Sequence, residues 1–175
     1  RAVLRDNDVV AAAQALTMAG SLTVEQLSVS GYYRSTGSDS VSILGALTKH
    51  AYLHGLISET ALSTKSPIDM YSATHTASIS VKDCYTRCDA AAGKYSRILT
   101  TGNVTVEDNT FVSQDRGLIV FGADTLLWAG NRHVSSSDPN PSHTANRIVS
   151  TINASGKVVA IGTAAPTTGT WATGD

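Results

Sequence analysis

The chain has 175 residues, which is enough for one domain, and 42% of them are hydrophobic, which suffices for a core. Only 15% are charged, the formal net charge is −1 and no basic run occurs, so nucleic acid is not an expected partner, because its binding depends on neutralising phosphates. No apolar run is as long as a membrane span and no signal peptide is recognisable, so membrane insertion is not expected either.

A short strand pattern recurs along the chain. The phrase V-T-V-E-D-N-T-F, which begins at Val104, is echoed by L-L-W-A-G-N-R-H, which begins at Leu126. Apolar and outward residues alternate in both phrases, as in a half-buried strand. The second apolar position, here called the anchor, recurs every 20 to 29 residues, at Leu4, Val24, Leu53, Val81, Val106, Trp128 and Ile152.

The first coil and the segment after it need separate treatment. The chain starts at Arg1 without a methionine and already reads as a mid-coil strand, so we expect it to be a fragment of a longer protein. Residues 8–20 could form a helix, capped by Asp6 or Asp8 and stopped by Gly20. We favour a strand because Leu4 is in register, and the helix remains an alternative.

Strands that recur while the loops between them vary in length are typical of a parallel β-helix, in which each coil contributes short strands. A sandwich of antiparallel strands is the alternative. It would need hairpin turns such as Asn-Gly or Asp-Gly, which this sequence lacks. We therefore expect a β-helix over residues 1–161 and, after the coil pattern ends near Gly162, a short linker over residues 162–175 that leads to a missing C-terminal module.

The position three residues past the anchor predicts an asparagine ladder inside the turn. Asparagine tolerates left-handed turns, and stacked amides can bond to each other and to the backbone. The non-polar members of this column would substitute for the amide. The column contains Asn7, Leu27, Leu56, Cys84, Asn109 and Asn131.

The cysteines and two histidines give no sign of a metal site. Cys84 and Cys88 lack His or Cys partners at metal-ligand spacing, so we expect free thiols, no metal and no cofactor. His75 and His143 fall in expected loops, with no partner identifiable from the sequence.

The coil phrases V-T-V-E-D-N-T-F and L-L-W-A-G-N-R-H resemble the pectate-lyase-like right-handed β-helix. The tail, A-P-T-T-G-T-W at residues 165–171 and the final G-D, looks like a segment near the ends of bacteriophage tailspike and tail-fibre chains. The fold class expected is therefore all-β, a right-handed parallel β-helix (solenoid) of about six coils.

This resemblance implies a homotrimeric virion protein, made in the bacterial cytoplasm and assembled with other phage tail or baseplate proteins. Such a protein binds, and often depolymerises, a host surface polysaccharide such as capsule or O-antigen. The alternative is a non-catalytic receptor-binding or structural shaft portion of a tail fibre. No catalytic residue can be carried over, because these spikes share no catalytic motif.

The outward residue after each anchor forms a column in which a glycan could bind. We expect Arg5, Glu25, His54, Lys82 and Glu107 in this column, flanked by Tyr52. Tyrosine faces and fixed charges suit sugar recognition, so Tyr52, His54, Lys82 and Glu107 are the predicted glycan-binding residues. The same column could instead be solvated side chains whose unlike charges support the sheet.

Asp83 and Asp108 are the predicted catalytic pair. They occupy the same turn position in adjacent coils, and stacked strands lie roughly 4.8 Å apart. Retaining glycosidases place two carboxyl groups roughly 5–5.5 Å apart. The same residues could instead bind calcium or simply favour the turn. A lyase would use a base such as His54, Lys82 or Tyr52, and trimeric spikes can also build sites between chains.

Overall fold

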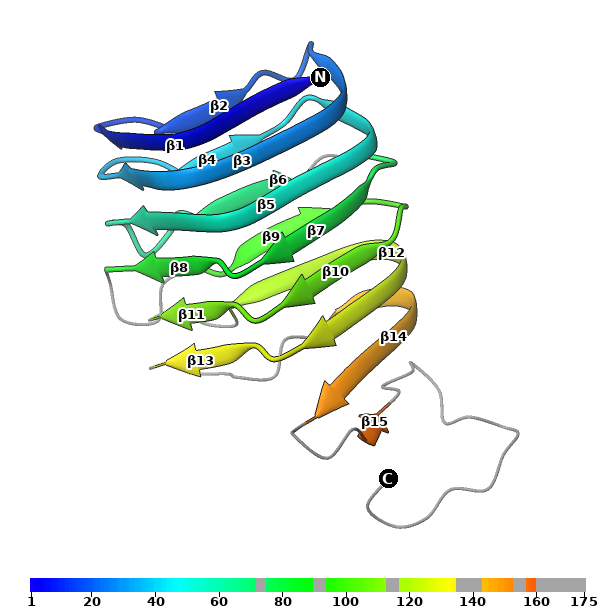
Figure 1. The fold of residues 1–175 in the computed structure, drawn as a ribbon. Helices are drawn as coiled ribbons and strands as arrows, with labels where there is room; N and C mark the ends of the chain where they lie inside the picture. Colours follow the sequence, from blue (N-terminus) through cyan, green and yellow to red (C-terminus); the bar gives the residue numbers. More distant parts are fainter. Residues whose placement is uncertain (72–74, 90–93, 113–116, 135–142, 153–156, 160–175) are drawn as a thin grey trace.

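The computed structural model describes residues 1–71, 75–89, 94–112, 117–134, 143–152 and 157–159, and every element within these ranges is a β-strand. The chain winds into a parallel β-solenoid of about five turns, close to the six coils expected (Figure 1). Strands in front run leftward, the chain returns behind them to the right, and each coil lies below the last, so the solenoid is right-handed. The all-β parallel β-helix is confirmed. The predicted linker at residues 162–175 lies outside the described residues.

The strands form three stacks, which are named here by the order in which the chain enters them. Stack 1 contains β1 (Ala2–Ala11), β3 (Thr23–Ser35), β5 (Ala46–Thr60), β7 (Ser78–Lys82), β10 (Val104–Glu107), β12 (Leu118–Ala129) and β14 (Thr144–Ile152). Stack 2 contains the second halves of β1, β3 and β5, then β8 (Tyr85–Cys88), β11 (Thr110–Val112) and β13 (Arg132–Val134). Stack 3, at the back, contains β2 (Leu16–Met18), β4 (Val41–Ile43), β6 (Ile68–Tyr71), β9 (Ser96–Leu99) and the first half of β12. β15 (Lys157–Val159) pairs antiparallel with β14.

Residues 8–20 contain no helix and form the end of one strand, a bend and a second strand. β1 continues to Ala11, and β2 begins at Leu16 and pairs in parallel with β4. The strand prediction for this segment is confirmed. Pairing with the next coil satisfies the backbone groups here, and it prevails over the helical propensity of the alanines.

The anchor column differs from the predicted one in two coils. Leu4 and Leu53 both pair with Val29, so Val29 is the anchor of the second coil and the prediction of Val24 was wrong. The second coil contains two pairs of apolar residues at alternate positions. The pair that ends with Val29 lies nearer the corner and occupies the anchor register. Val24 lies at the start of β3, pairs with Leu47 and is half-buried.

Trp128 pairs with Ser150, so Ile152 is not an anchor either. The corrected anchors Leu4, Val29, Leu53, Val81, Val106, Trp128 and Ser150 are spaced at 22 to 28 residues, a narrower range than the predicted one.

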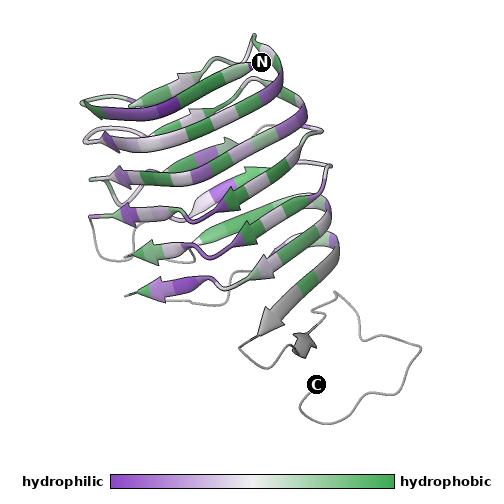
Figure 2. Cartoon of the chain, viewed as in Figure 1, coloured by the Kyte–Doolittle hydropathy of each residue, from purple (hydrophilic) through white to green (hydrophobic). Residues whose placement is uncertain are grey.

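The core fills the inside of the coil with stacked aliphatic side chains. Val29, Leu53, Val81 and Val106 are completely buried, and the inward residues of stack 3 complete the same cluster from behind. Figure 2 shows the apolar and polar bands alternating along the front strands. Each buried aliphatic side chain stabilises the fold by about 1.5–3 kcal/mol. Trp128 is only half-buried, although it packs against this cluster.

Stacks 1 and 2 meet at a sharp corner, which one left-handed residue makes in each of five coils. This residue lies two positions past the anchor, where φ is +54° at Asp6, +61° at Gly55, +53° at Asp83, +55° at Asp108 and +64° at Gly130. Glycine reaches this region without steric cost, and aspartate reaches it more readily than most residues. The corner therefore selects Gly or Asp at this position.

The predicted asparagine ladder forms directly after this corner. The Asn109 amide donates to the Val81 carbonyl (3.0 Å) and to Asn131 Oδ1 (2.9 Å), and Asn109 Oδ1 accepts from the Cys84 amide (2.9 Å). Asn131 in turn donates to the Val106 carbonyl (2.8 Å). Each amide thus binds the anchor carbonyl of the preceding coil.

Cys84 takes the place of an asparagine in this ladder. Its thiol donates to the carbonyl of the anchor Leu53 (2.9 Å), and burial raises the pKa of the thiol to about 11, which keeps it protonated. Leu27 does not belong to the column as predicted, because Gly31 pairs with both Asn7 and Leu56. A side chain at Gly31 would meet the Asn7 backbone at 2.5 Å, so this coil has no room for an amide there.

Candidate functional site

The outer face of stack 1 carries the predicted glycan column, with one change. His54, Lys82 and Glu107 pair in register across β5, β7 and β10, as expected. Glu25 leaves the column because the second anchor is Val29, and the residue after this anchor, Ser30, falls at a register shift of β3. Glu25 forms an exposed ion pair with Lys49 (3.0 Å).

Tyr52 stands out from this face. Its cross-strand partners in the neighbouring coils are Ser28 and Ser80, whose small side chains leave the tyrosine ring uncovered from both sides. The residue is 42% exposed. Along its own strand the ring contacts His50 and His54, with ring centroids 6.0 and 5.6 Å away. The result is an aromatic ridge of three rings on the outer face of stack 1.

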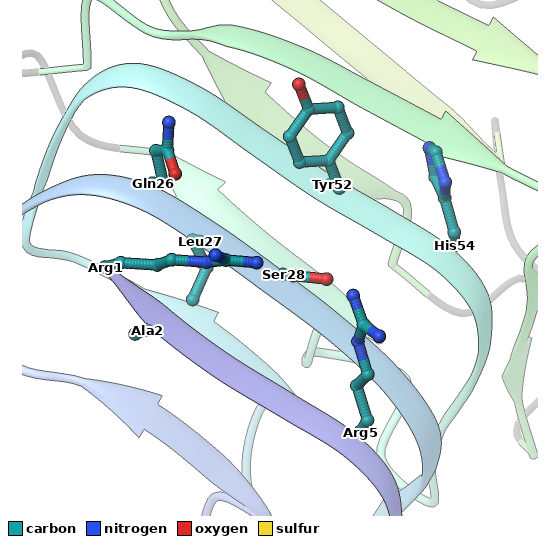
Figure 3. A pocket seen from close by; sticks show the side chains of 8 residues that line it. All are labelled: Arg1, Ala2, Arg5, Gln26, Leu27, Ser28, Tyr52 and His54. Carbon is teal, nitrogen blue, oxygen red and sulfur yellow. The ribbon is translucent and has the colours of Figure 1, made fainter.

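A shallow groove of about 360 Å³ lies beside this ridge, across β1, β3 and β5 (Figure 3). In Figure 3 the Arg1 and Arg5 side chains extend toward Ser28, while Tyr52 and His54 rise from the next strand. The groove is lined by Arg1, Ala2, Arg5, Gln26, Leu27, Ser28, Tyr52 and His54.

The groove contains two of the four predicted glycan-binding residues. His54 is fixed there by a hydrogen bond between its Nε2 and Ser80 Oγ (2.7 Å). Lys82 and Glu107 lie one and two coils further along the same column and are paired with each other (3.8 Å). Sequence reasoning placed Arg5 in the column, but it missed Gln26 and Ser28, because their positions depend on the corrected register of β3.

The predicted catalytic residues Asp83 and Asp108 are both exposed corner residues with positive φ. Lys82 Nζ lies 4.0 Å from Asp108 Oδ2. The Asp108 carboxylate lies over the next coil, where a Cβ on Gly130 would collide with Asp108 Oδ1. Their positions are those of turn residues, and a catalytic role for the pair stays a prediction.

A second charged cluster lies on the outer face of stack 2. Arg34 donates to Glu59 (3.2 Å) and to Asp89 (2.6 Å), Arg87 pairs with Asp89 (3.3 Å), and the Tyr32 hydroxyl donates to Glu59 (3.0 Å). Burial, and then the Glu59 bond, raise the pKa of Tyr32. The cluster is internally paired. The only signal for this cluster in the sequence is that the charges of Arg34, Glu59 and Arg87 alternate in sign. These residues align across neighbouring coils when positions are counted from the corner onward.

Stack 3 carries a third polar feature, an ion pair between the buried Asp69 and the partly buried Arg97. Arg97 contacts Asp69 through two hydrogen bonds of 2.8 Å, and its guanidinium lies 4.8 Å from the centre of the Tyr71 ring. Tyr71 also packs edge-on against Phe121 (5.4 Å). The Tyr71 backbone amide donates to Asp69 Oδ1, so the pair fixes the end of β6.

His75 and His143 both have backbone partners, which sequence reasoning did not identify. His75 is buried, its Nδ1 accepts from the Leu47 amide (3.3 Å) and its Nε2 donates to the Ile43 carbonyl (3.1 Å). His143 Nδ1 accepts from the Val120 amide (3.2 Å). Burial lowers the pKa of both rings, to about 4 for His143. These neutral histidines are structural acceptors.

Within the described residues, no three His, Cys, Asp or Glu side chains are placed to hold a metal ion, and neither cysteine forms a disulfide. The described part of the chain contains no helix long and apolar enough to cross a membrane. Comparison of the chain with protein-family models, curated proteins and solved structures found no match. The fold places the chain in the class of parallel β-solenoids.

Proposed function

We propose that the chain is a polysaccharide-binding segment of a phage tailspike or tail fibre, and that the outer face of stack 1 is its binding surface. The observation that carries this proposal is Tyr52, an exposed ring between two serines that lines a groove. A polysaccharide is a linear ligand, and a solenoid offers it successive coils roughly 4.8 Å apart. Aromatic faces supply apolar contact for sugar rings, and the polar column supplies hydrogen bonds.

The proposal includes the assembly implied by the tailspike resemblance. Three copies would associate as a homotrimer in the virion, in contact with other tail or baseplate proteins. A monodisperse monomer of the complete protein in light scattering would contradict the trimer while leaving the binding surface to be tested separately.

We further propose that the chain binds the polysaccharide and that the Asp83/Asp108 pair does not cleave it. Both residues occupy a backbone position that other coils fill with glycine, so the turn alone accounts for them. The double change Asp83→Asn and Asp108→Asn keeps a residue that tolerates the left-handed turn. If the complete protein releases reducing ends from capsule or O-antigen, this variant should release them at the wild-type rate. A loss of cleavage with binding retained would assign the acid and base roles to the pair.

Substitution of Tyr52 tests the binding surface. Tyr52→Ala should weaken binding to host polysaccharide by roughly 10-fold, because an aromatic contact and its buried area are lost. The matched control is Tyr71→Ala, which removes a similarly exposed tyrosine from stack 3. Affinity electrophoresis in gels containing capsule or O-antigen measures both variants. Equal retardation of the Tyr52 variant and wild type, or a loss confined to the Tyr71 variant, would place the surface elsewhere.

A further inference from the structure

The charges that line the groove have one sign. Its charged side chains are Arg1 and Arg5, and none of its lining residues is acidic. Within the described coils no carboxylate forms an ion pair with Arg5, whereas Arg34, Arg97 and Lys82 are all paired. Asp6 follows Arg5 in sequence but serves the corner. The groove therefore keeps a guanidinium available, whereas Lys49 and Lys82 of stack 1 are paired with carboxylates.

The shape of the groove suits a single ring-shaped unit with a charged substituent. Arg5 stands on β1 and His54 on β5, two strand spacings apart, which is about 9.6 Å. Ser28 lies on the strand between them, and its short side chain leaves the groove open. One edge of the groove is aromatic and the opposite edge is cationic.

We propose that this groove binds an acidic sugar unit, of the uronic-acid class, within the polysaccharide. The Arg5 guanidinium binds the carboxylate through two parallel hydrogen bonds, a geometry that guanidinium and carboxylate share, and Arg1 adds positive charge. Tyr52 packs against the sugar ring, while Gln26 and Ser28 bond to its hydroxyls. This inference rests on the proposed polysaccharide function and specifies the class of its ligand.

The test compares four polymers by calorimetry at about 0.15 M salt, where interactions between separated surface charges are largely screened. Polygalacturonate and hyaluronate carry carboxylates, dextran sulfate carries charge without carboxylates, and dextran is neutral. We expect the complete protein to bind at least one uronate polymer more tightly than dextran sulfate, and not to bind dextran. Arg5→Gln should weaken uronate binding by about 10- to 100-fold, the usual effect of losing hydrogen bonds to a charged group.

The control is Arg132→Gln, which removes an exposed guanidinium from stack 2 and should leave binding unchanged. Unfolding curves establish that both variants are folded. Binding to neither uronate polymer, equal or tighter binding to dextran sulfate, or equal effects of the two substitutions would overturn the inference. Tyr52-dependent binding of a neutral glycan would overturn it while preserving the proposed function. If neither these polymers nor host capsule or O-antigen binds, both fail.

Discussion

Single residues inside the turn contribute to stability through bonds between coils. Asn109 is almost fully buried, and it binds the coil before it and the coil after it at once. Removing its amide leaves the Cys84 amide and the Val81 carbonyl without these partners in the interior. Buried polar groups that lose their partners cost more than the net value of the bond itself.

We therefore expect Asn109→Ala to lower the free energy of unfolding by about 1–3 kcal/mol. Urea denaturation followed by circular dichroism measures the change. Asn146→Ala is the control, because the Asn146 amide forms an exposed bond to Asp124 (3.2 Å) and its loss should be nearly neutral. Equal midpoints for Asn109→Ala and wild type would show that the ladder does not stabilise the coil.

The neutral histidines give stability a pH dependence with a defined sign. Burial lowers the pKa of His75 in the folded state, so the unfolded chain binds the proton more readily. The contribution of this residue to the free energy of unfolding is fully present above its pKa in the unfolded chain, near 6.5. This contribution is lost as the pH falls below that value. His143 acts in the same direction, with its loss extending to about pH 4.

His75→Gln should make stability less dependent on pH below about 6.5, because an amide can accept from Leu47 and donate to Ile43 without titrating. Thermal unfolding at a series of pH values gives the slope for each protein. His50→Gln, a change at an exposed histidine, serves as the control variant. An unchanged slope for His75→Gln would contradict this assignment.

At the scale of elements, the corner between stacks 1 and 2 is the repeating unit that the sequence encodes most directly. Asp6, Gly55, Asp83, Asp108 and Gly130 all fall two residues past an anchor. Their common requirement is positive φ, which explains why each of them is a glycine or an aspartate.

Substitutions at Asp108 test this requirement. Asp108→Gly should leave the free energy of unfolding unchanged or raise it by up to about 1 kcal/mol, while Asp108→Val should lower it by about 1–2 kcal/mol. The loss of the Lys82 contact is minor, because both side chains are exposed. Urea denaturation of both variants provides the comparison. Destabilisation by glycine with tolerance of valine would show that the carboxylate, and not the turn, determines the residue.

The elements also show what the sequence could predict. The alternation of apolar and polar residues identified the strands of five coils and the column His54, Lys82 and Glu107. It could do so because side chains of a strand point alternately inward and outward, which is visible in the sequence. It misplaced Val24 because β3 carries two register shifts, and an apolar pair at either end satisfies the same pattern. The groove needed the corrected register, since the openness beside Tyr52 depends on the small Ser28.

At the scale of the whole molecule, the solenoid separates three surfaces with different chemistry. Stack 1 carries the aromatic ridge and the cationic groove, stack 2 an internally paired charge cluster, and stack 3 the Asp69–Arg97 pair beneath Tyr71. Because each coil contacts mainly its neighbours, changes on one surface should be felt within adjacent coils. Substitutions on the three surfaces can therefore be compared as largely independent tests.

An experimental structure of the complete protein with an oligosaccharide from the host polysaccharide tests the central claim most directly. We predict a sugar ring packed on Tyr52 across β1, β3 and β5, with the glycan continuing along stack 1 toward Lys82 and Glu107. Sugar bound at the Arg34–Glu59 cluster of stack 2, or along stack 3, with the stack 1 face empty, would contradict the account.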